Sequence, residues 1–244
     1  MLNISSSLRK IQVTVAAIGL AVAHTTLAQL PSVTWAAAAD NFVEQGPAPT
    51  DLLAVGSLVL VGTFDINMTA IQANQDPTFL FNHFATFGSS SIGTGTSGAA
   101  GTWRDTTQRS TATTTLGSGT VYPVAGQRIY IWVFNAPTIA GATEQGIFSL
   151  STDSTHTAPA ASWIFPTDNV VLNTTTIDLQ DLTDGLSHSQ LLANADVVIG
   201  GFSASRMNFE TAPIVVPEPS TYGLIVVGLA VCSVWARRRS RAKA

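Results

Sequence analysis

The sequence predicts a mainly β fold, an antiparallel β-sandwich with one or two short helices, flanked by an N-terminal signal peptide and a C-terminal single apolar helix. Short runs rich in Val, Ile, Phe, Trp and Tyr recur between Gly, Pro, Asn, Asp and Thr, which is the pattern of strands. Charged residues make up 11% of the chain, against roughly 25% in an ordinary soluble domain. Each end carries a short apolar segment beside basic residues.

Residues 1–28 have the three zones of a secretory signal peptide. Arg9 and Lys10 precede an apolar run at 11–23, and small residues follow as far as Ala28. The run has 13 residues, about 20 Å as a helix, which is short against a bilayer core of about 30 Å. We therefore expect signal peptidase to cleave after Ala28, with Ala23 as a second possible site and an uncleaved anchor as the alternative.

The body, residues 29–215, is predicted to form one β-rich domain. Several of its apolar runs are apolar on both faces for most of their length, which suits central strands covered on both sides. The predicted strands are 57–64, 128–134, 146–150, 162–165, 175–179 and 197–202.

One helix is predicted over 77–87. Asp76 can cap its N-terminus, and a proline fits its first position. Leu80, Phe84 and Phe87 would then form one apolar stripe that packs on a sheet.

Two other segments of the body are less regular. A weaker helix is predicted at 186–195. The tract 88–120 is mostly Gly, Ser and Thr, so it forms either a flexible loop or polar edge strands around Trp103.

The charge and cysteine content of the chain exclude several functions for the body. From residue 29 to 216 there are 14 carboxylates, 4 arginines and no lysine, a net charge of −10. Nucleic-acid binding is excluded as a leading function, because it needs clustered positive charge. The only cysteine is Cys232, outside the body, so the body holds no disulfide, no cysteine-bound zinc and no cysteine nucleophile.

The body offers weak matches to catalytic and nucleotide-binding motifs. Residues 93–98 spell G-x-G-x-x-G, but neither a predicted strand before them nor a helix after them gives the context of a nucleotide site. His83, His156 and His188 could serve as bases for a serine nucleophile, yet the chain has no G-x-S-x-G elbow. Structural roles for these histidines are favoured, and no cofactor is expected.

Two further groups of residues have a structural and a functional interpretation. Asp178, Asp181 and Asp184 could hold Ca²⁺, or they form a solvated acidic turn, which is favoured. Tyr130, Trp132 and Phe134 alternate onto one side of a strand. Their rings could stack on a sugar, but large rings on a strand more often fill a core, so a core position is expected.

The C-terminal segment 216–244 has a Pro-Glu-Pro element, a short apolar run and a basic cluster, in that order. Its residues are Pro217, Glu218 and Pro219, then 222–236, then Arg237, Arg238 and Arg239. The apolar run spans about 22 Å as a helix, and the cluster behind it is expected to stay in the cytoplasm. A single-pass anchor is the simplest interpretation of this pattern.

In detail, this segment resembles the bacterial PEP-CTERM sorting signal, through Val216-Pro217-Glu218-Pro219-Ser220-Thr221, the short helix and the terminal arginines. The resemblance implies handling by an exosortase, a membrane-embedded transpeptidase, with transient anchoring in the inner membrane. The block 126–149 also resembles a segment in the bodies of other PEP-CTERM proteins of unknown function. The resemblance implies a setting in bacteria that produce exopolysaccharide.

The expected function is therefore that of an exported protein of the cell envelope or extracellular matrix, with exopolysaccharide as a candidate partner and without catalytic activity. A carbohydrate-binding module is the first alternative. A secreted hydrolase is the second. An exposed row of aromatic rings would favour the sugar binder, and convergent histidines and carboxylates in a cleft would favour the hydrolase.

Overall fold

The structure is a computed structural model and describes residues 32–37, 41–46, 51–96, 98–109, 113–150, 156, 163–167, 174–183, 186–193, 196–203 and 206–215. The predicted signal peptide and the predicted sorting segment lie outside these residues. Among the helices described, none has the length and apolar character needed to cross a membrane.

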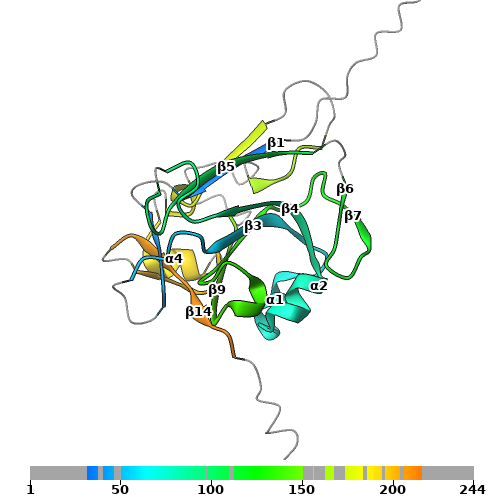
Figure 1. Cartoon of the computed structure of the whole chain (residues 1–244). Helices are drawn as coiled ribbons and strands as arrows, with labels where there is room; N and C mark the ends of the chain where they lie inside the picture. The colour runs from blue at the N-terminus through cyan, green and yellow to red at the C-terminus, as the bar shows by residue number, and fades with distance from the viewer. Residues whose placement is uncertain are drawn as a thin grey trace, which may run out of the picture.

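The described chain is mainly β, with antiparallel sheets and a few short helices (Figure 1). The strands are β1 (Ser32–Ala37), β2 (Val43–Glu44), β3 (Leu58–Phe64), β4 (Phe84–Ser91), β5 (Trp103–Gln108), β6 (Thr113–Thr115), β7 (Val121–Pro123), β8 (Tyr130–Phe134), β9 (Glu144–Phe148), β10 (Thr174–Asp178), β11 (Val197–Ile199), β12 (Gly201–Ser203), β13 (Asn208–Glu210) and β14 (Ala212–Pro213). The helices are α1 (Met68–Ala73), α2 (Pro77–Asn82), η1 (Ile139–Gly141, a 3₁₀ turn), α3 (Gln180–Thr183) and α4 (His188–Ala193).

A central sheet runs through the molecule in the order β11-β9-β8-β3-β4, and β14 pairs with β9. All of its pairings are antiparallel, and Leu60, Trp132 and Ile147 lie side by side across β3, β8 and β9. Successive side chains of a strand point to opposite faces, so these apolar strands present core residues on both sides. The prediction that the most apolar runs are covered on both faces is confirmed.

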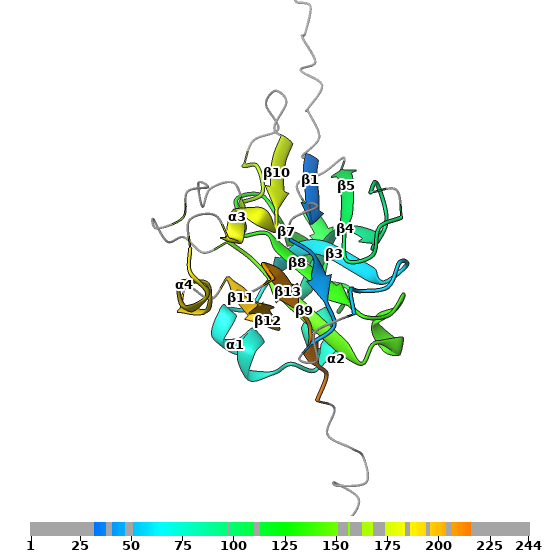
Figure 2. The ribbon, with the colours of Figure 1, turned by 90° about the vertical axis from the view of Figure 1, so that its left-hand side faces the viewer.

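One face of the central sheet, the sheet-covered face, packs against two three-stranded sheets, β10-β1-β5 and β12-β13-β2. In both views β1, β5 and β10 lie on one side of β3 and β4, and the helices α1 and α2 lie on the other (Figures 1 and 2). Val61, Ile131 and Phe148 share this core with Trp35 and Trp103. The pairs β1/β10 and β2/β13 are parallel, which a purely antiparallel fold would not contain.

The opposite face, the helix-covered face, packs against α1 and α2. Its core contains Ile71 from α1 and Leu80 from α2, together with Phe64, Phe84 and Trp132 from the sheet. The ring centroid of Phe64 lies 4.8 Å from that of Phe84 and 5.9 Å from that of Trp132. Aromatic rings therefore fill most of the space between the sheet and the two short helices.

The helix predicted over 77–87 is half as long as expected. Asp76 does cap it, because its Oδ1 accepts a hydrogen bond from the Thr78 N–H at 2.9 Å, but the helix ends at Asn82. Residues from Phe84 onward form β4 and pair with β3. A run apolar at Phe84, Ala85 and Phe87 fits a strand covered on both sides as well as a helix, and pairing with β3 decides between them. The predicted single stripe is wrong, because Leu80 and Phe84 lie in the core of the helix-covered face and Phe87 lies in the other core.

Other predicted segments differ in how regular they are. The strands at 57–64, 128–134, 146–150 and 175–179 and the helix at 186–195 are confirmed with shifted ends. The run 162–165 contributes only a bridge between Ile164 and Arg128. The run 197–202 is two strands separated by Gly200, whose φ is +114°.

The tract 88–120 contains the end of β4, all of β5 and β6, and a buried Trp103. The second of the two expectations for this tract, polar strands around Trp103, is the correct one for its described residues.

Candidate functional site

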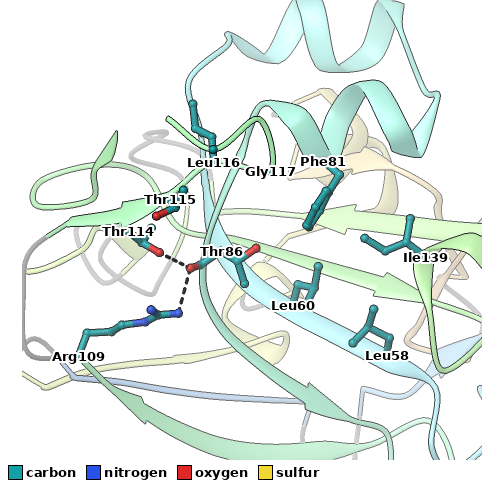
Figure 3. Close-up of a pocket in the computed structure, with 11 residues that line it drawn as sticks. Leu58, Leu60, Phe81, Thr86, Arg109, Thr114, Thr115, Leu116, Gly117 and Ile139 are labelled. Carbon is teal, nitrogen blue, oxygen red and sulfur yellow. Dashed lines mark hydrogen bonds between the residues drawn. The ribbon is translucent and has the colours of Figure 1, made fainter. Parts of the chain in front are cut away.

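An open groove of about 720 Å³ lies on the helix-covered side of the molecule (Figure 3). The side chains of Leu58, Leu60, Phe81 and Ile139 gather at one end of it, and Arg109 lies at the other. The groove has an apolar end and a cationic end. Its remaining lining residues are Thr86, Thr114, Thr115, Leu116, Gly117 and Gly119.

The turn between β6 and β7 forms one wall of the groove. The N–H of Gly117 donates to the carbonyl of Phe81 at 3.1 Å, which seats the turn on the end of α2. A Cβ on Gly117 would lie 2.2 Å from that carbonyl oxygen, so only glycine allows this approach. Leu116 bridges to Ala85 of β4 and fixes the turn from the other side.

Arg109 follows β5 and is held by backbone carbonyls. Its Nε donates to the carbonyl of Phe87 at 2.6 Å, and its Nη2 donates to the carbonyl of Thr86 at 3.2 Å. The hydroxyl of Thr114 donates to the same Thr86 carbonyl at 2.7 Å. Among the described residues no carboxylate lies within ion-pair distance of Arg109.

A second hollow of about 480 Å³ adjoins the groove and shares Phe81 and Ile139 with it. Its other walls come from the start of α2 at Asp76 and Pro77, and from Ile214 after β14. The turn η1, which carries Ile139, therefore separates two hollows on the same face of the sheet.

Two of the three predicted base histidines pair with aspartates, in very different settings. His83 Nδ1 lies 2.8 Å from Asp65 Oδ1, with the side chains 33% and 26% exposed. His156 Nε2 lies 2.8 Å from Asp196 Oδ2, and both side chains are fully buried. The side chain of His188 is outside the described part. A buried pair with no access to solvent has no route to a substrate.

Arg128 forms a buried polar cluster with Ser149 beside the Asp196 carboxylate. Its Nε donates to Ser149 Oγ at 2.6 Å, and Ser149 Oγ donates to the carbonyl of Ile129. Burial lowers the pKa of Arg128, and the charges of Tyr130 and Asp196 oppose that shift. Ser149 is fully buried with its hydroxyl bonded on both sides, so it is not placed as a nucleophile.

The three predicted ring residues of β8 are core residues. Tyr130, Trp132 and Phe134 are 6%, 0% and 0% exposed. The expectation that they fill the core is confirmed, and in this position none of them can stack on a sugar. The alternative interpretation of these rings as a sugar contact is therefore wrong for this structure.

The two described carboxylates of the predicted acidic cluster, those of Asp178 and Asp181, accept hydrogen bonds from groups close to them in the fold. Asp181 Oδ2 accepts hydrogen bonds from Trp163 Nε1 and from the backbone N–H of Asp178, each at 3.0 Å. Asp178 Oδ1 accepts from the N–H of Gln180. Asp184 is outside the described residues, so the calcium site stays a prediction. The residues that are described contain no group of three metal-ligating side chains.

The glycine motif at 93–98 lies in a turn that leads to strand β5, and no helix follows it. Gly93, Gly95 and Gly98 have positive φ angles, and a Cβ on Gly95 would lie 2.2 Å from the carbonyl oxygen of Arg104. These glycines serve a tight turn. The expectation that no strand precedes the motif is wrong, because β4 ends at Ser91, but no helix follows it as a nucleotide site would need.

Sequence reasoning missed a buried carboxylate cluster around β2 and β13. Arg206 lies 3.0 Å from Glu44 and 3.3 Å from Glu210, and the amide of Asn208 donates to Glu44. Thr211 donates to Glu144 at 2.5 Å. Glu44 and Glu144 are far in sequence from the segment 206–211, so no local pattern could have joined the three. The same holds for the groove, whose walls come from β3, α2, β4, Arg109, the β6–β7 turn and η1.

Comparison of the chain with known protein families, with curated proteins and with solved structures finds no match.

Proposed function

We propose that this chain is an exported, non-catalytic protein of the bacterial cell envelope or extracellular matrix, with a β-sandwich body and a C-terminal segment that an exosortase processes. The body would sit outside the inner membrane in association with exopolysaccharide. The apolar run at 222–236 would hold the chain in that membrane until processing.

The observation that supports a non-catalytic body is that three of its chemically capable groups, around His156, Ser149 and Asp181, serve the fold, while the partly exposed His83–Asp65 pair does not line the groove or the hollow. The His156–Asp196 pair is sealed from solvent, and Asp181 holds the indole of Trp163. Ser149 is bonded to Arg128 and Ile129. A hydrolase needs a nucleophile and a base that converge on an accessible point. In the described part, none of these groups lines the groove or the adjoining hollow.

The proposal for sorting rests on the sequence at the chain's two ends. A signal peptide places the body outside, and the five basic residues from 237 to 243 favour a cytoplasmic tail. The Pro-Glu-Pro element lies between the last described strand and the apolar run, where a processing enzyme in the membrane would meet it.

A matched set of variants tests the sorting proposal in the producing bacterium. The triple variant Pro217→Ala, Glu218→Ala, Pro219→Ala removes the element but keeps the apolar run and the arginines. The neighbouring double variant Ser220→Ala, Thr221→Ala is the control. C-terminal mass spectrometry and envelope fractionation report whether Arg237, Arg238 and Arg239 remain attached.

We expect the native chain and the control to lose the arginine cluster, and the triple variant to keep it and remain in the membrane. Deleting residues 217–244 should release a folded body into the medium. A native chain that always keeps its arginines, in a host that encodes an exosortase, would contradict the proposal. So would a triple variant that is trimmed as the native chain is.

A further inference from the structure

We propose that the groove in Figure 3 binds a single-chain anionic amphiphile of the fatty-acid class, with its carboxylate at Arg109 and its alkyl chain along Leu58, Leu60 and Ile139. This inference goes beyond the proposed function and does not depend on it. It rests on the two unlike ends of the groove and on the guanidinium of Arg109, which no carboxylate of the described residues pairs with.

At its apolar end the groove lies against β3, where Leu58 is half-buried and Leu60 is 5% exposed. Leu58 and Leu60 are alternate residues of β3 and point to the helix-covered face. Phe81, at the end of α2, and Ile139, on η1, flank them and are only half-buried. When an alkyl chain covers such a surface, the free energy of the complex falls by roughly 25 cal/mol for each Å² of apolar surface removed from water.

The cationic end carries a charge that no carboxylate of the described residues neutralises. A guanidinium has five N–H donors, and Arg109 uses two of them on backbone carbonyls. These neutral acceptors fix the side chain in place without cancelling its charge. Arg206 shows the contrast, because it lies between the carboxylates of Glu44 and Glu210. Arg109 is thus positioned, charged and open to an anion.

The charge and size of the site select the class of ligand. The body is strongly acidic and has only four arginines, so a half-buried cation beside apolar side chains is unusual in it. A volume of about 720 Å³ falls in the range of sites for one small molecule. This favours a single chain with an anionic head over a two-chain lipid, and an anion over a neutral or cationic amphiphile.

The test uses the exported protein as recovered from its producing culture, freed of bound amphiphiles on a hydrophobic resin. The probe is 11-(dansylamino)undecanoic acid, whose fluorescence reports binding. Dodecanoate and dodecanol, below their aggregation limits, compete for the site with the same chain length and different heads. We expect dodecanoate to displace the probe at a concentration about tenfold lower, since hydrogen bonds to a charged group are the stronger kind.

Two pairs of variants locate the site. Arg109→Gln should remove the preference for dodecanoate. Arg104→Gln removes the same charge at an exposed position of β5 and should keep the preference. Ile139→Glu should weaken both ligands by about tenfold or more. Val55→Glu, at an exposed apolar residue outside the groove, should change neither.

Three outcomes would overturn the proposal. The first is that neither ligand displaces the probe from the native protein, as expected if a protein segment covers the groove. The second is that the native protein binds dodecanol as tightly as dodecanoate. The third is that Arg104→Gln and Arg109→Gln behave alike. The comparison of the two ligands needs only the native protein, so it decides the matter even if Arg109→Gln does not fold.

Discussion

The two faces of the central sheet are covered in different ways, and the cover decides what each face can do. On the sheet-covered face, extended strands lay a continuous second layer over the apolar side chains. On the helix-covered face, α1 and α2 have only six residues each, and they leave part of the sheet open beside them. The groove and the adjoining hollow both lie against residues of the helix-covered face.

The polar groups within the two cores differ as well. On the helix-covered face, Trp132 Nε1 donates to Gln145 Oε1 at 3.1 Å, and Gln145 Nε2 donates to the carbonyl of Gln75. On the sheet-covered face, the indole N–H groups of Trp35 and Trp103 are buried and have no hydrogen-bond partner among the described residues. The indole at the centre of the helix-covered face is therefore hydrogen-bonded, whereas two of the three indoles in the sheet-covered core are held by packing and the third, that of Trp163, donates to Asp181.

The largest expected effect comes from removing the ring at the centre of the helix-covered face. Trp132→Ala should lower the free energy of unfolding by about 3–5 kcal/mol, because it empties a fully buried site among Phe64, Phe84 and Phe134. Urea unfolding measures the change. Val121→Ala, at a residue 67% exposed, is the control and should change stability by less than about 0.5 kcal/mol. Comparable losses for both would contradict the assignment of this core.

A second prediction separates the two faces by their indole groups. Trp132→Phe should be more destabilising than Trp35→Phe by about 1–3 kcal/mol. The first change leaves the side-chain amide oxygen Oε1 of Gln145 without its buried donor. The second removes an indole N–H that has no partner among the described residues. The two changes delete the same atoms, so the loss of packing largely cancels in the comparison. Equal costs in chemical unfolding would show that the Gln145 bond contributes nothing.

The third prediction concerns the seat of the β6–β7 turn on α2. Gly117→Ala should cost about 1–3 kcal/mol, because its Cβ would meet the Phe81 carbonyl and push the turn away. It should also weaken binding of the dansyl probe, since the turn forms a wall of the groove. Ser118→Ala, at the exposed neighbouring residue, is the matched control for both readouts. An unaffected thermal midpoint for Gly117→Ala would contradict this account.

The smallest expected effect is a dependence of stability on alkaline pH. Burial raises the pKa of Tyr130, and the charge of Arg128 opposes that shift. An unfolded chain loses a tyrosine proton near pH 10, at about the unperturbed value. The folded chain holds this proton to higher pH, so the unfolded state binds fewer protons and stability falls above about pH 10.

Tyr130→Phe should make that fall shallower in thermal unfolding between about pH 9 and pH 11. Ser118→Ala, at an exposed residue without a titratable group, is the control and should keep the slope of the native chain. A native slope that persists in Tyr130→Phe would show that this phenol does not contribute.

Local patterns in the sequence were enough to predict most strands of the central sheet. Continuous apolar runs such as those of β3 and β8 have few alternatives to a position covered on both sides. The prediction failed at Phe84, where helical and extended spacing coincide and only pairing with β3 decides. It failed again at Gly200, where a positive φ divides one apolar run into two strands.

The groove could not be predicted from the sequence, for a physical reason. Its apolar end joins β3, the end of α2 and η1, and its cationic end comes from Arg109 after β5. No two of these segments share a motif or a spacing. The one available indication was that Arg109 is among only four arginines in an acidic body without lysine. That rarity marks a residue for attention but does not reveal its neighbours.

The pairing of early strands with late ones has a consequence for the time course of folding. β2 pairs with β13, β1 pairs with β10, and the N–H of Phe42 bonds to Asn208 across 166 positions. Contacts between such distant segments form slowly, because a long loop must close before they are made. A chain that leaves the ribosome from its N-terminus cannot complete the second layer of strands until its last part has been synthesised. The unfinished chain would therefore lack this second layer for most of its synthesis, and the apolar side chains of the sheet-covered face would stay in contact with water until the last strands are made.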